Sequence, residues 1–296
     1  MLKMYQKHAH SGSSVELWEE NWQSAQFYNA LEFCRIDPLR PLFEKYAKKD
    51  SLMLEGGCGM GQYVTFYTER GVKVIGLDFA QRALHQLNRR VSDLKLCAGN
   101  VADLPFADET FDVYYSGGVV EHFEGGAEKS LSEACRVLKK NGVLLISVPY
   151  FSPLRRMLSP FKKEIWRRVG KSEAEGKTEN GLNFFQYAYQ PHEFSKMLEN
   201  AGLEVIEKQG YAVLWGLSDL PFLGEKSEVQ ATENGHPKPT PIEETPDLSN
   251  VNQPVSASLL KRLVVGEDAS IPVLGLGVKF MRWSVSNMMM YVCVRR

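Results

Sequence analysis

The stretch that decides the fold, residues 52–63, reads LMLEGGCGMGQY. Its first three residues form an apolar run typical of a buried strand, and the apolar segment that begins at Tyr63 indicates a helix. Between the two lie an acid, Glu55, and a glycine-rich loop, which permits sharp turns and a close approach of the backbone to a ligand. A strand that passes through such a loop into a helix is the usual opening of a doubly wound nucleotide-binding fold.

A tight turn without a ligand would explain the glycine loop taken alone. The next apolar segment, residues 72–78, favours a nucleotide site because it also ends in an acid. Asp78 lies 23 residues after Glu55, at the tip of the second predicted strand, where a carboxylate can accept hydrogen bonds from both ribose hydroxyls. The alternative role for Asp78 is to cap the helix predicted at residues 80–90, and the two roles are compatible.

The patterns along residues 51–150 alternate between strand and helix, as expected for a parallel sheet. The run at 143–148 is almost continuously apolar, which is typical of a strand buried on both faces. Pro191 begins a further predicted helix, and two more strands follow it. The predicted strands are 52–54, 72–78, 94–98, 111–115, 143–148, 203–211 and 288–294, and the predicted helices among them are 80–90, 131–138 (stopped by Asn141-Gly142) and 191–201.

Segments outside this alternation divide the chain further. Helical patterns occur at 15–22, 30–33 and 42–46, and four aromatic residues near them could be plain core: Trp18, Trp22, Phe27 and Tyr28. A late segment with five prolines and six acids has almost no large apolar residue to bury. The predicted division is 1–50 for an N-terminal helical cap, 51–223 and 281–296 for the main domain, 151–190 for a basic helical insertion, 224–256 for a disordered loop and 257–280 for an apolar cap segment.

The basic segment, residues 155–171, contains seven Lys or Arg residues and one acid. Ser159-Pro160 is typical of an N-cap and helix start, and the apolar residues that follow fall on one helical face: Phe161, Ile165, Trp166 and Val169. A basic amphipathic helix can lie on an anionic membrane or bind an anionic acceptor. The alternative is a solvated insertion helix with its apolar side on the domain, and the sequence leaves both open.

Four blocks, in order and with ordinary spacing, resemble the motifs of class I S-adenosylmethionine-dependent methyltransferases, in the group with a type 11-like domain and small-molecule or lipid-like acceptors. They are EGGCGMG at 55–61, GLD at 76–78, GNVADLPF at 99–106 and YSGGVVEH at 115–122. The resemblance covers residues 50–212 and the last strand. It implies an α/β fold with a Rossmann-like doubly wound sheet of seven strands, an antiparallel last strand between the fifth and sixth, N-terminal helices and a cap insertion. It also implies that the N-terminal helices form one wall of the acceptor pocket, so the four aromatic residues near them could form that wall instead of plain core.

The resemblance implies S-adenosylmethionine as the cofactor, with its methionine end over the loop at 57–61. Glu55 and the Gly117 carbonyl are expected near the ammonium group of the cofactor. Asp78 is expected to accept hydrogen bonds from the ribose hydroxyls. No metal site is expected. The predicted cofactor-binding residues are Glu55, Gly56, Gly57, Gly59, Gly61, Asp78, Phe79, Asn100, Val101 and Gly117.

The adenine ring is expected to lie against Phe79. The Val101 N–H is expected to donate to a ring nitrogen, and the Asn100 side-chain oxygen is expected to accept from the adenine amino group. Asn100 stands where the family often has Asp, so the loss of charge is expected to weaken binding by about 1 kcal/mol. A nicotinamide dinucleotide is the rival ligand, but its fingerprint spaces the glycines as G-x-G-x-x-G. An acid such as Glu55 would repel a pyrophosphate, whereas it attracts an ammonium.

His122 is the predicted catalytic base, because it follows the fourth strand where the methyl group should emerge and because imidazole titrates near neutral pH. The alternative is that Glu121-His122 is a structural or cofactor-contacting pair. His192 is a weaker candidate base. Nothing in the sequence selects among three tyrosines that could line the acceptor pocket, namely Tyr5, Tyr150 and Tyr187.

The predicted enzyme transfers a methyl group to an O, N or C atom of a small-molecule or lipid-like acceptor by in-line displacement. The alternatives are a protein that binds the cofactor without turnover, and a methyltransferase that acts on a macromolecule. A net charge of −1 gives no general attraction to nucleic acid, and the block at 116–119 lacks the proline typical of nucleic-acid amino-methyltransferases. The expected partner is therefore a small-molecule or lipid-like substrate and not nucleic acid, and a peripheral contact of residues 155–171 with an anionic membrane stays one of the two alternatives for that segment.

Five scattered cysteines without a CxxC pair indicate reduced thiols and a cytoplasmic setting. The N-terminus lacks the apolar core of a signal peptide. Residues 271–294 are apolar but are interrupted by proline and charge, so they do not predict a membrane span.

Overall fold

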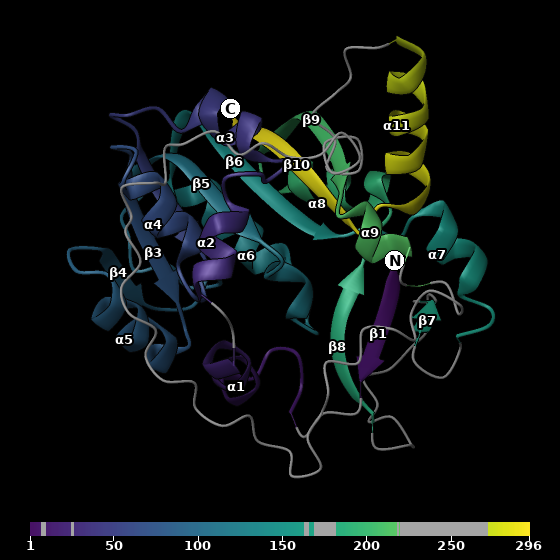
Figure 1. Ribbon diagram of the computed structural model, residues 1–296, viewed down its shortest axis with the longest axis horizontal. Helices are drawn as coiled ribbons and strands as arrows, with labels where there is room; N and C mark the ends of the chain where they lie inside the picture. Colours follow the sequence, from purple (N-terminus) through teal and green to yellow (C-terminus); the bar gives the residue numbers. More distant parts are fainter. Residues whose placement is uncertain (7–9, 25–26, 163–165, 169–181, 218, 220–271) are drawn as a thin grey trace.

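The computed structural model describes residues 1–6, 10–24, 27–162, 166–168, 182–217, 219 and 272–296. These residues form two β-sheets and the helices that pack on them (Figure 1). The larger sheet has seven strands in the order β4-β3-β2-β5-β6-β10-β9, and the smaller sheet has three in the order β7-β1-β8. The predicted seven-stranded α/β architecture is therefore confirmed, and the second sheet is an addition to it.

The core of the large sheet is parallel, and its strand order reverses next to β2. From β2 the chain moves outward through β3 and β4, and it then returns to the other side of β2 with β5 and β6. In such sheets ligands bind outside the carboxyl ends of the strands, where the order reverses. The parallel strands are β2 (Leu52–Gly56), β3 (Lys73–Asp78), β4 (Lys95–Ala98), β5 (Phe111–Gly117) and β6 (Leu138–Pro149).

The last strand is antiparallel, as the resemblance implies. Strand β10 (Met288–Arg295) pairs with β6 on one side and with β9 (Leu203–Tyr211) on the other. Its central residues are fully buried, because both of its edges are paired and both faces of the sheet are covered.

Helices cover both faces of the large sheet, so the core divides into two apolar clusters. One cluster joins the sheet to α6 (Glu128–Val137) and α8 (Pro191–Asn200). The other joins it to α4 (Gln62–Thr68) and α5 (Gln81–Arg90), with Ala83, Leu84 and Leu87 forming the predicted buried side of α5. In α5, α6 and α8, the apolar residues that recur with the helical period in the sequence are therefore the residues that pack on the sheet.

The N-terminal region contains the three predicted helices and one unpredicted strand. The helices are α1 (Val15–Ser24), α2 (Phe27–Phe33) and α3 (Arg40–Tyr46). Strand β1 (Leu2–Gln6) pairs antiparallel with β8 (Asn183–Ala188), with Leu2 opposite Ala188. The N-terminal cap is therefore not wholly helical, because its first residues complete a sheet with a distant segment of the chain.

The predicted basic helix after Ser159 is wrong. Helix α7 (Pro153–Leu158) lies before that position and ends at Ser159, and Pro160 follows the helix end, as prolines often do. Strand β7 (Trp166–Arg168) then pairs antiparallel with β1. Pairing with a strand from the N-terminus, which local periodicity cannot reveal, overrides the helical spacing. Ile165 and Val169 lie outside the described residues.

Two further boundaries differ from the predictions. Helix α6 ends at Val137 and β6 begins at Leu138, so the helix does not continue to Asn141-Gly142. Buried Leu138 pairs with Phe111, which extends the strand in the N-terminal direction.

The late segments are described only in part. The predicted disordered loop at 224–256 and most of the predicted cap segment lie outside the described residues. The end of that segment belongs to α11 (Pro272–Val285), which packs beside α7 and α9 (Val213–Leu217) at the periphery of the molecule (Figure 1). Within the described ranges, no helix combines the length and apolarity that a bilayer crossing requires.

Candidate cofactor and acceptor site

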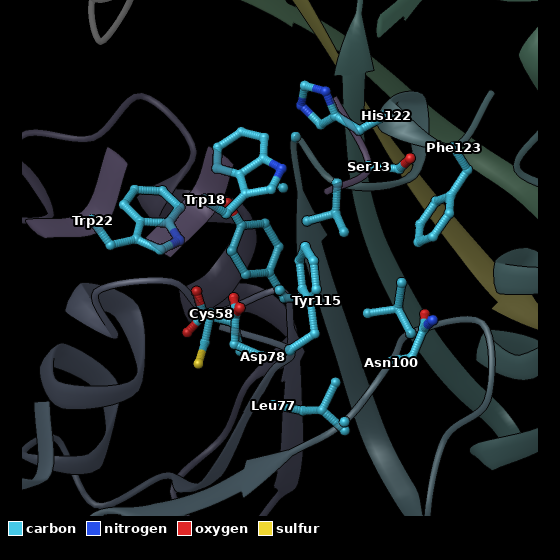
Figure 2. Close-up of a pocket in the computed structure, with 18 of the residues that line it drawn as sticks. Ser13, Trp18, Trp22, Cys58, Leu77, Asp78, Asn100, Tyr115, His122 and Phe123 are labelled. Carbon is cyan, nitrogen blue, oxygen red and sulfur yellow. The ribbon is translucent and has the colours of Figure 1, made fainter. Parts of the chain in front are cut away.

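A cavity lies at the carboxyl ends of β2, β3 and β5, where the strand order reverses. It holds about 870 Å³ of space, its open mouth included, which suits a cofactor together with a small acceptor. Seven of the ten predicted cofactor-binding residues line it, together with the predicted base His122: Glu55, Gly57, Asp78, Phe79, Asn100, Val101 and Gly117. Figure 2 shows side chains from several elements converging on this space.

The other three predicted glycines support the loop and do not line the cavity. Gly59 and Gly61 have φ values of 51° and 70°, in the left-handed region that favours glycine. A Cβ on Gly59 would lie 2.6 Å from the Trp22 ring, and a Cβ on Gly56 would lie 2.3 Å from the Tyr114 hydroxyl. The loop therefore needs glycine at these positions to fit beneath its neighbours.

Asp78 is buried and holds the glycine loop against β3. Its two carboxylate oxygens accept hydrogen bonds from the Gly59 N–H at 2.7 Å and the Ala80 N–H at 2.8 Å. Burial raises the pKa of Asp78, and these backbone hydrogen bonds oppose the rise. The alternative helix-capping role is wrong, because the N-cap of α5 is Ala80, without a side-chain hydrogen bond. Each oxygen keeps a second lone pair, so the carboxylate can still accept hydrogen bonds from a ligand.

Glu55 is a buried acid whose charge lacks compensation. Its Oε2 atom has no hydrogen-bond partner among the described residues. Burial raises the pKa of Glu55 well above its ordinary value, and the nearby charge of Asp78 adds to the rise. Because a buried carboxylate is stabilised by an opposite charge, this site fits the ammonium group of S-adenosylmethionine.

Asn100 lies on the opposite side of the cavity from Trp18 and Trp22 (Figure 2), and Val101 also lines the cavity. The Asn100 side-chain oxygen accepts a hydrogen bond from the Ala102 N–H at 2.9 Å, which closes a turn after β4. That oxygen has a second lone pair, so it remains able to accept a hydrogen bond from an amino group.

Helix α1 places two tryptophans over the cavity. Trp18 and Trp22 stack with ring centroids 5.5 Å apart, and the Trp18 indole N–H donates to the Gly12 carbonyl at 2.8 Å. Both line the cavity, whereas Phe27 is buried in the core and Tyr28 packs against it. Trp18 and Trp22 thus belong to the cavity wall, and Phe27 and Tyr28 belong to the core.

His122 lies in a short 3₁₀ turn, Val120–His122, just after β5. Its Nδ1 is 2.8 Å from the Phe185 carbonyl oxygen, which can only accept, so Nδ1 carries the proton. Burial lowers the pKa of His122 to about 4, and the hydrogen bond to Phe185 opposes this effect. The imidazole is therefore neutral at pH 7 and keeps a lone pair on Nε2.

Glu121, beside it, is also buried, and its Oε1 is 3.9 Å from the His122 Nε2. Burial raises the pKa of Glu121 to about 8. Burial disfavours the charged form of both groups, which opposes an ion pair at this contact.

The remaining sequence candidates lie elsewhere. His192 is exposed in the first turn of α8 and does not line the cavity. The Tyr150 and Tyr187 hydroxyls donate to the carbonyls of Trp283 and Glu124, and Tyr5 also lies outside the lining. Cys58 does line the cavity, but burial raises the pKa of its thiol well above the ordinary value, which disfavours a reactive thiolate.

Sequence reasoning missed several residues of the cavity wall. Gly12 and Ser13 come from the loop before α1, and Tyr63, Tyr115 and Phe123 are further lining residues. No local pattern marks the first two, since they reach the cavity only through the packing of α1 across the strand ends.

Comparison with known proteins gives consistent matches. Residues 54–146 match the family described as "Methyltransferase domain". A protein from Mycolicibacterium smegmatis, described as a probable S-adenosylmethionine-dependent methyltransferase, is 31% identical over 183 residues, covering 60% of this chain and 62% of that protein. A demethylmenaquinone methyltransferase from Renibacterium salmoninarum is 34% identical over 113 residues, covering 37% of this chain and 47% of that protein. The chain thus spans less than two thirds of the length of these relatives.

A solved structure supports the fold. It is a complex between the Haloferax volcanii Trm112 methyltransferase activator and a protein described as a methyltransferase, with a TM-score of 0.54 and 14% identity, covering 94% of this chain and 97% of that one. The fold, the cavity and the family match define the class: this chain carries a class I S-adenosylmethionine-dependent methyltransferase domain. The cofactor of this domain is S-adenosylmethionine.

Proposed function

We propose that this protein transfers the methyl group of S-adenosylmethionine to an uncharged or cationic small-molecule or lipid-like acceptor. The observation that carries the proposal is the composition of the cavity wall. The described lining residues include Glu55 and Asp78 but no Lys or Arg. Because Glu55 and Asp78 are assigned to the cofactor, the described lining offers no cation to pair with an anionic acceptor, whereas an uncharged or cationic acceptor needs none.

The cofactor supplies a methyl group activated by a sulfonium. We assign Glu55 to its ammonium, with the Gly117 carbonyl beside it, and Asp78 to its ribose hydroxyls. The adenine is assigned to the residues that follow β3 and β4 and line the same cavity, namely Phe79, Asn100 and Val101. The glycine loop lets the backbone approach the ligand closely.

The acceptor is assigned to the space beside Trp18 and His122, whose ring centroids lie 4.8 Å apart. The indole rings exclude water and orient an apolar acceptor, which is the main contribution a protein can make to methyl transfer. For a hydroxyl acceptor, the His122 Nε2 lone pair takes the proton, since Nδ1 is held by Phe185. The low pKa of His122 keeps the base form present at neutral pH but limits its proton affinity.

The test is an assay for S-adenosylhomocysteine release with matched sets of neutral, cationic and carboxylate acceptors. Turnover with neutral or cationic acceptors supports the proposal, and turnover confined to carboxylates contradicts it. Calorimetric binding of S-adenosylhomocysteine without release across all sets would favour the alternative of a binding protein without turnover.

A macromolecular acceptor is the second alternative, and adding RNA or protein fractions to the same assay tests it. We also propose a cytoplasmic setting without a nucleic-acid partner, on the basis of the net charge of −1 and the scattered cysteines. The predicted membrane contact at residues 155–171 loses its helical basis, because Trp166–Arg168 form a strand.

A further inference from the structure

Large apolar side chains are exposed mainly in one part of the described structure. Ten such residues are exposed, and seven of them belong to α7 and the turn after it, to α9, or to α11. We call this group the apolar face. Its members are Met157, Phe161, Trp215, Leu276, Phe280, Met281 and Trp283.

Helix α11 presents its apolar residues outward. Leu276, Phe280 and Trp283 are spaced as i, i+4 and i+7, which places them on one side of the helix, and they are 70%, 63% and 56% exposed. The Phe280 and Trp283 ring centroids lie 5.7 Å apart. A helix that faces only water carries polar residues on this side, so the pattern indicates a surface that something covers.

The inner side of α11 is attached to the domain. The helix packs on α7, α9 and β9, and the Tyr150 hydroxyl donates to the Trp283 carbonyl at 3.0 Å. Figure 1 shows α11 at the edge of the molecule beside α7. The apolar face is therefore part of a packed unit and not a single loose helix.

The charge around the apolar face is mainly positive. Its described segments contain five cations and one acid, Asp219, whose carboxylate pairs with the buried Arg155 at 2.7 Å and lies 3.9 Å from Lys162, so Arg155 adds no net charge to the surface. The remaining cations are Arg156, Lys279 and Arg282. Aromatic residues and methionines beside an excess of cations suit the interface of an anionic bilayer, where rings enter the headgroup region and cations meet phosphates.

We propose that the apolar face docks the protein on an anionic lipid surface. This inference goes beyond the methyl transfer proposed above, and it replaces the predicted membrane contact of a basic helix within residues 155–171 by a surface formed from α7 and the turn after it, α9 and α11. A lipid surface is favoured over a second copy of the chain because the excess of cations on one copy would repel the same cations on the other.

Vesicle flotation tests the proposal on the full chain. We expect the protein to float with vesicles of three parts phosphatidylcholine to one part phosphatidylglycerol, and far less with phosphatidylcholine alone. The double variant Phe280→Ser/Trp283→Ser should lower partitioning at least about tenfold, since two aromatic anchors are lost. Lys279→Glu should lower it about fivefold on the anionic vesicles.

The matched control is Phe33→Ser/Ile206→Ser, because those residues are similarly exposed, at 49% and 48%, but lie on other elements. It should float as the unchanged protein does. Equal loss in the control, or no flotation of the unchanged protein, overturns the proposal. Self-association without lipid that disappears in the Phe280/Trp283 variant would also overturn it, because it assigns the face to a second copy.

Two further measurements separate failure of this proposal from failure of the proposed function. S-adenosylhomocysteine binding should be retained in every variant, which shows that the domain is folded. Lipids with brominated acyl chains should quench the tryptophan fluorescence of the unchanged protein, and this quenching should fall in Trp215→Phe/Trp283→Phe. Unchanged quenching in that variant counts against the proposal.

Discussion

The two halves of the cavity are built from different kinds of segment. The half that we assign to the cofactor lies at the ends of neighbouring parallel strands, with Glu55 near the end of β2 and Asp78 at the end of β3. The half that we assign to the acceptor joins Trp18 of α1 to His122, and His122 is held by Phe185, 63 residues away in the chain. The difference indicates that cofactor binding and acceptor binding can be altered separately, since few residues serve both.

The largest expected effect concerns the cofactor half. Asp78→Ala should lower the affinity for S-adenosylhomocysteine by about 100-fold, because it removes hydrogen bonds to the ribose and the contact that holds the Gly59 N–H. Calorimetry measures the change, and Asp103→Ala, an exposed acid nearby, is the control. Unchanged affinity in the Asp78 variant would remove the basis of the assigned site.

A smaller effect is expected in the acceptor half. Trp18→Ala should lower kcat/KM for an identified acceptor about tenfold to fiftyfold, since a large apolar contact is lost. The affinity for S-adenosylhomocysteine should change by less than about threefold if the two halves are separate. Phe33→Ala, on an exposed part of α2, is the control. Equal losses for cofactor and acceptor would show that the halves are coupled.

Glu121 allows a test by pH. Burial raises the pKa of Glu121 from 4.5 to about 8, so this group stabilises the fold at low pH and that stability is lost as pH rises toward 8. His122 contributes in the opposite direction, but only below its ordinary 6.5, because its pKa is lowered to about 4.

Between pH 6.5 and 8, the unchanged protein should therefore lose about 2 kcal/mol of unfolding free energy that Glu121→Gln does not lose. Urea unfolding at several pH values measures the difference between the two proteins. Parallel stability curves would show that Glu121 is not protonated in the folded state at neutral pH.

The smallest expected effect is a gain. Asn100→Asp should strengthen S-adenosylmethionine binding about fivefold, because a charged oxygen is a stronger acceptor for the adenine amino group. Asn88→Asp, an exposed change on α5, should leave the affinity unaltered. Weaker binding in the Asn100 variant would place the adenine elsewhere.

Much of the large sheet could be predicted because its signals are local. The apolar runs ending at Glu55 and Asp78, and the buried side of α5, follow from spacing along short segments. The small sheet could not be predicted, since β1 and β8 lie far apart in the chain and meet only in the folded protein. The same long-range pairing with β1 explains why Trp166–Arg168 form a strand although their spacing suggested a helix.

For the site, the acid at each strand end and the glycine loop were visible in the sequence because each lies directly beside the strand that positions it. The protonation state of His122 could not be predicted. Its proton is placed on Nδ1 by the Phe185 carbonyl, and its pKa is lowered by burial. The order of residues thus determined the parallel sheet and the cofactor loops. Only the tertiary structure decided which side chains line the part of the cavity that we assign to the acceptor, because that wall is assembled from segments that meet after the chain has folded.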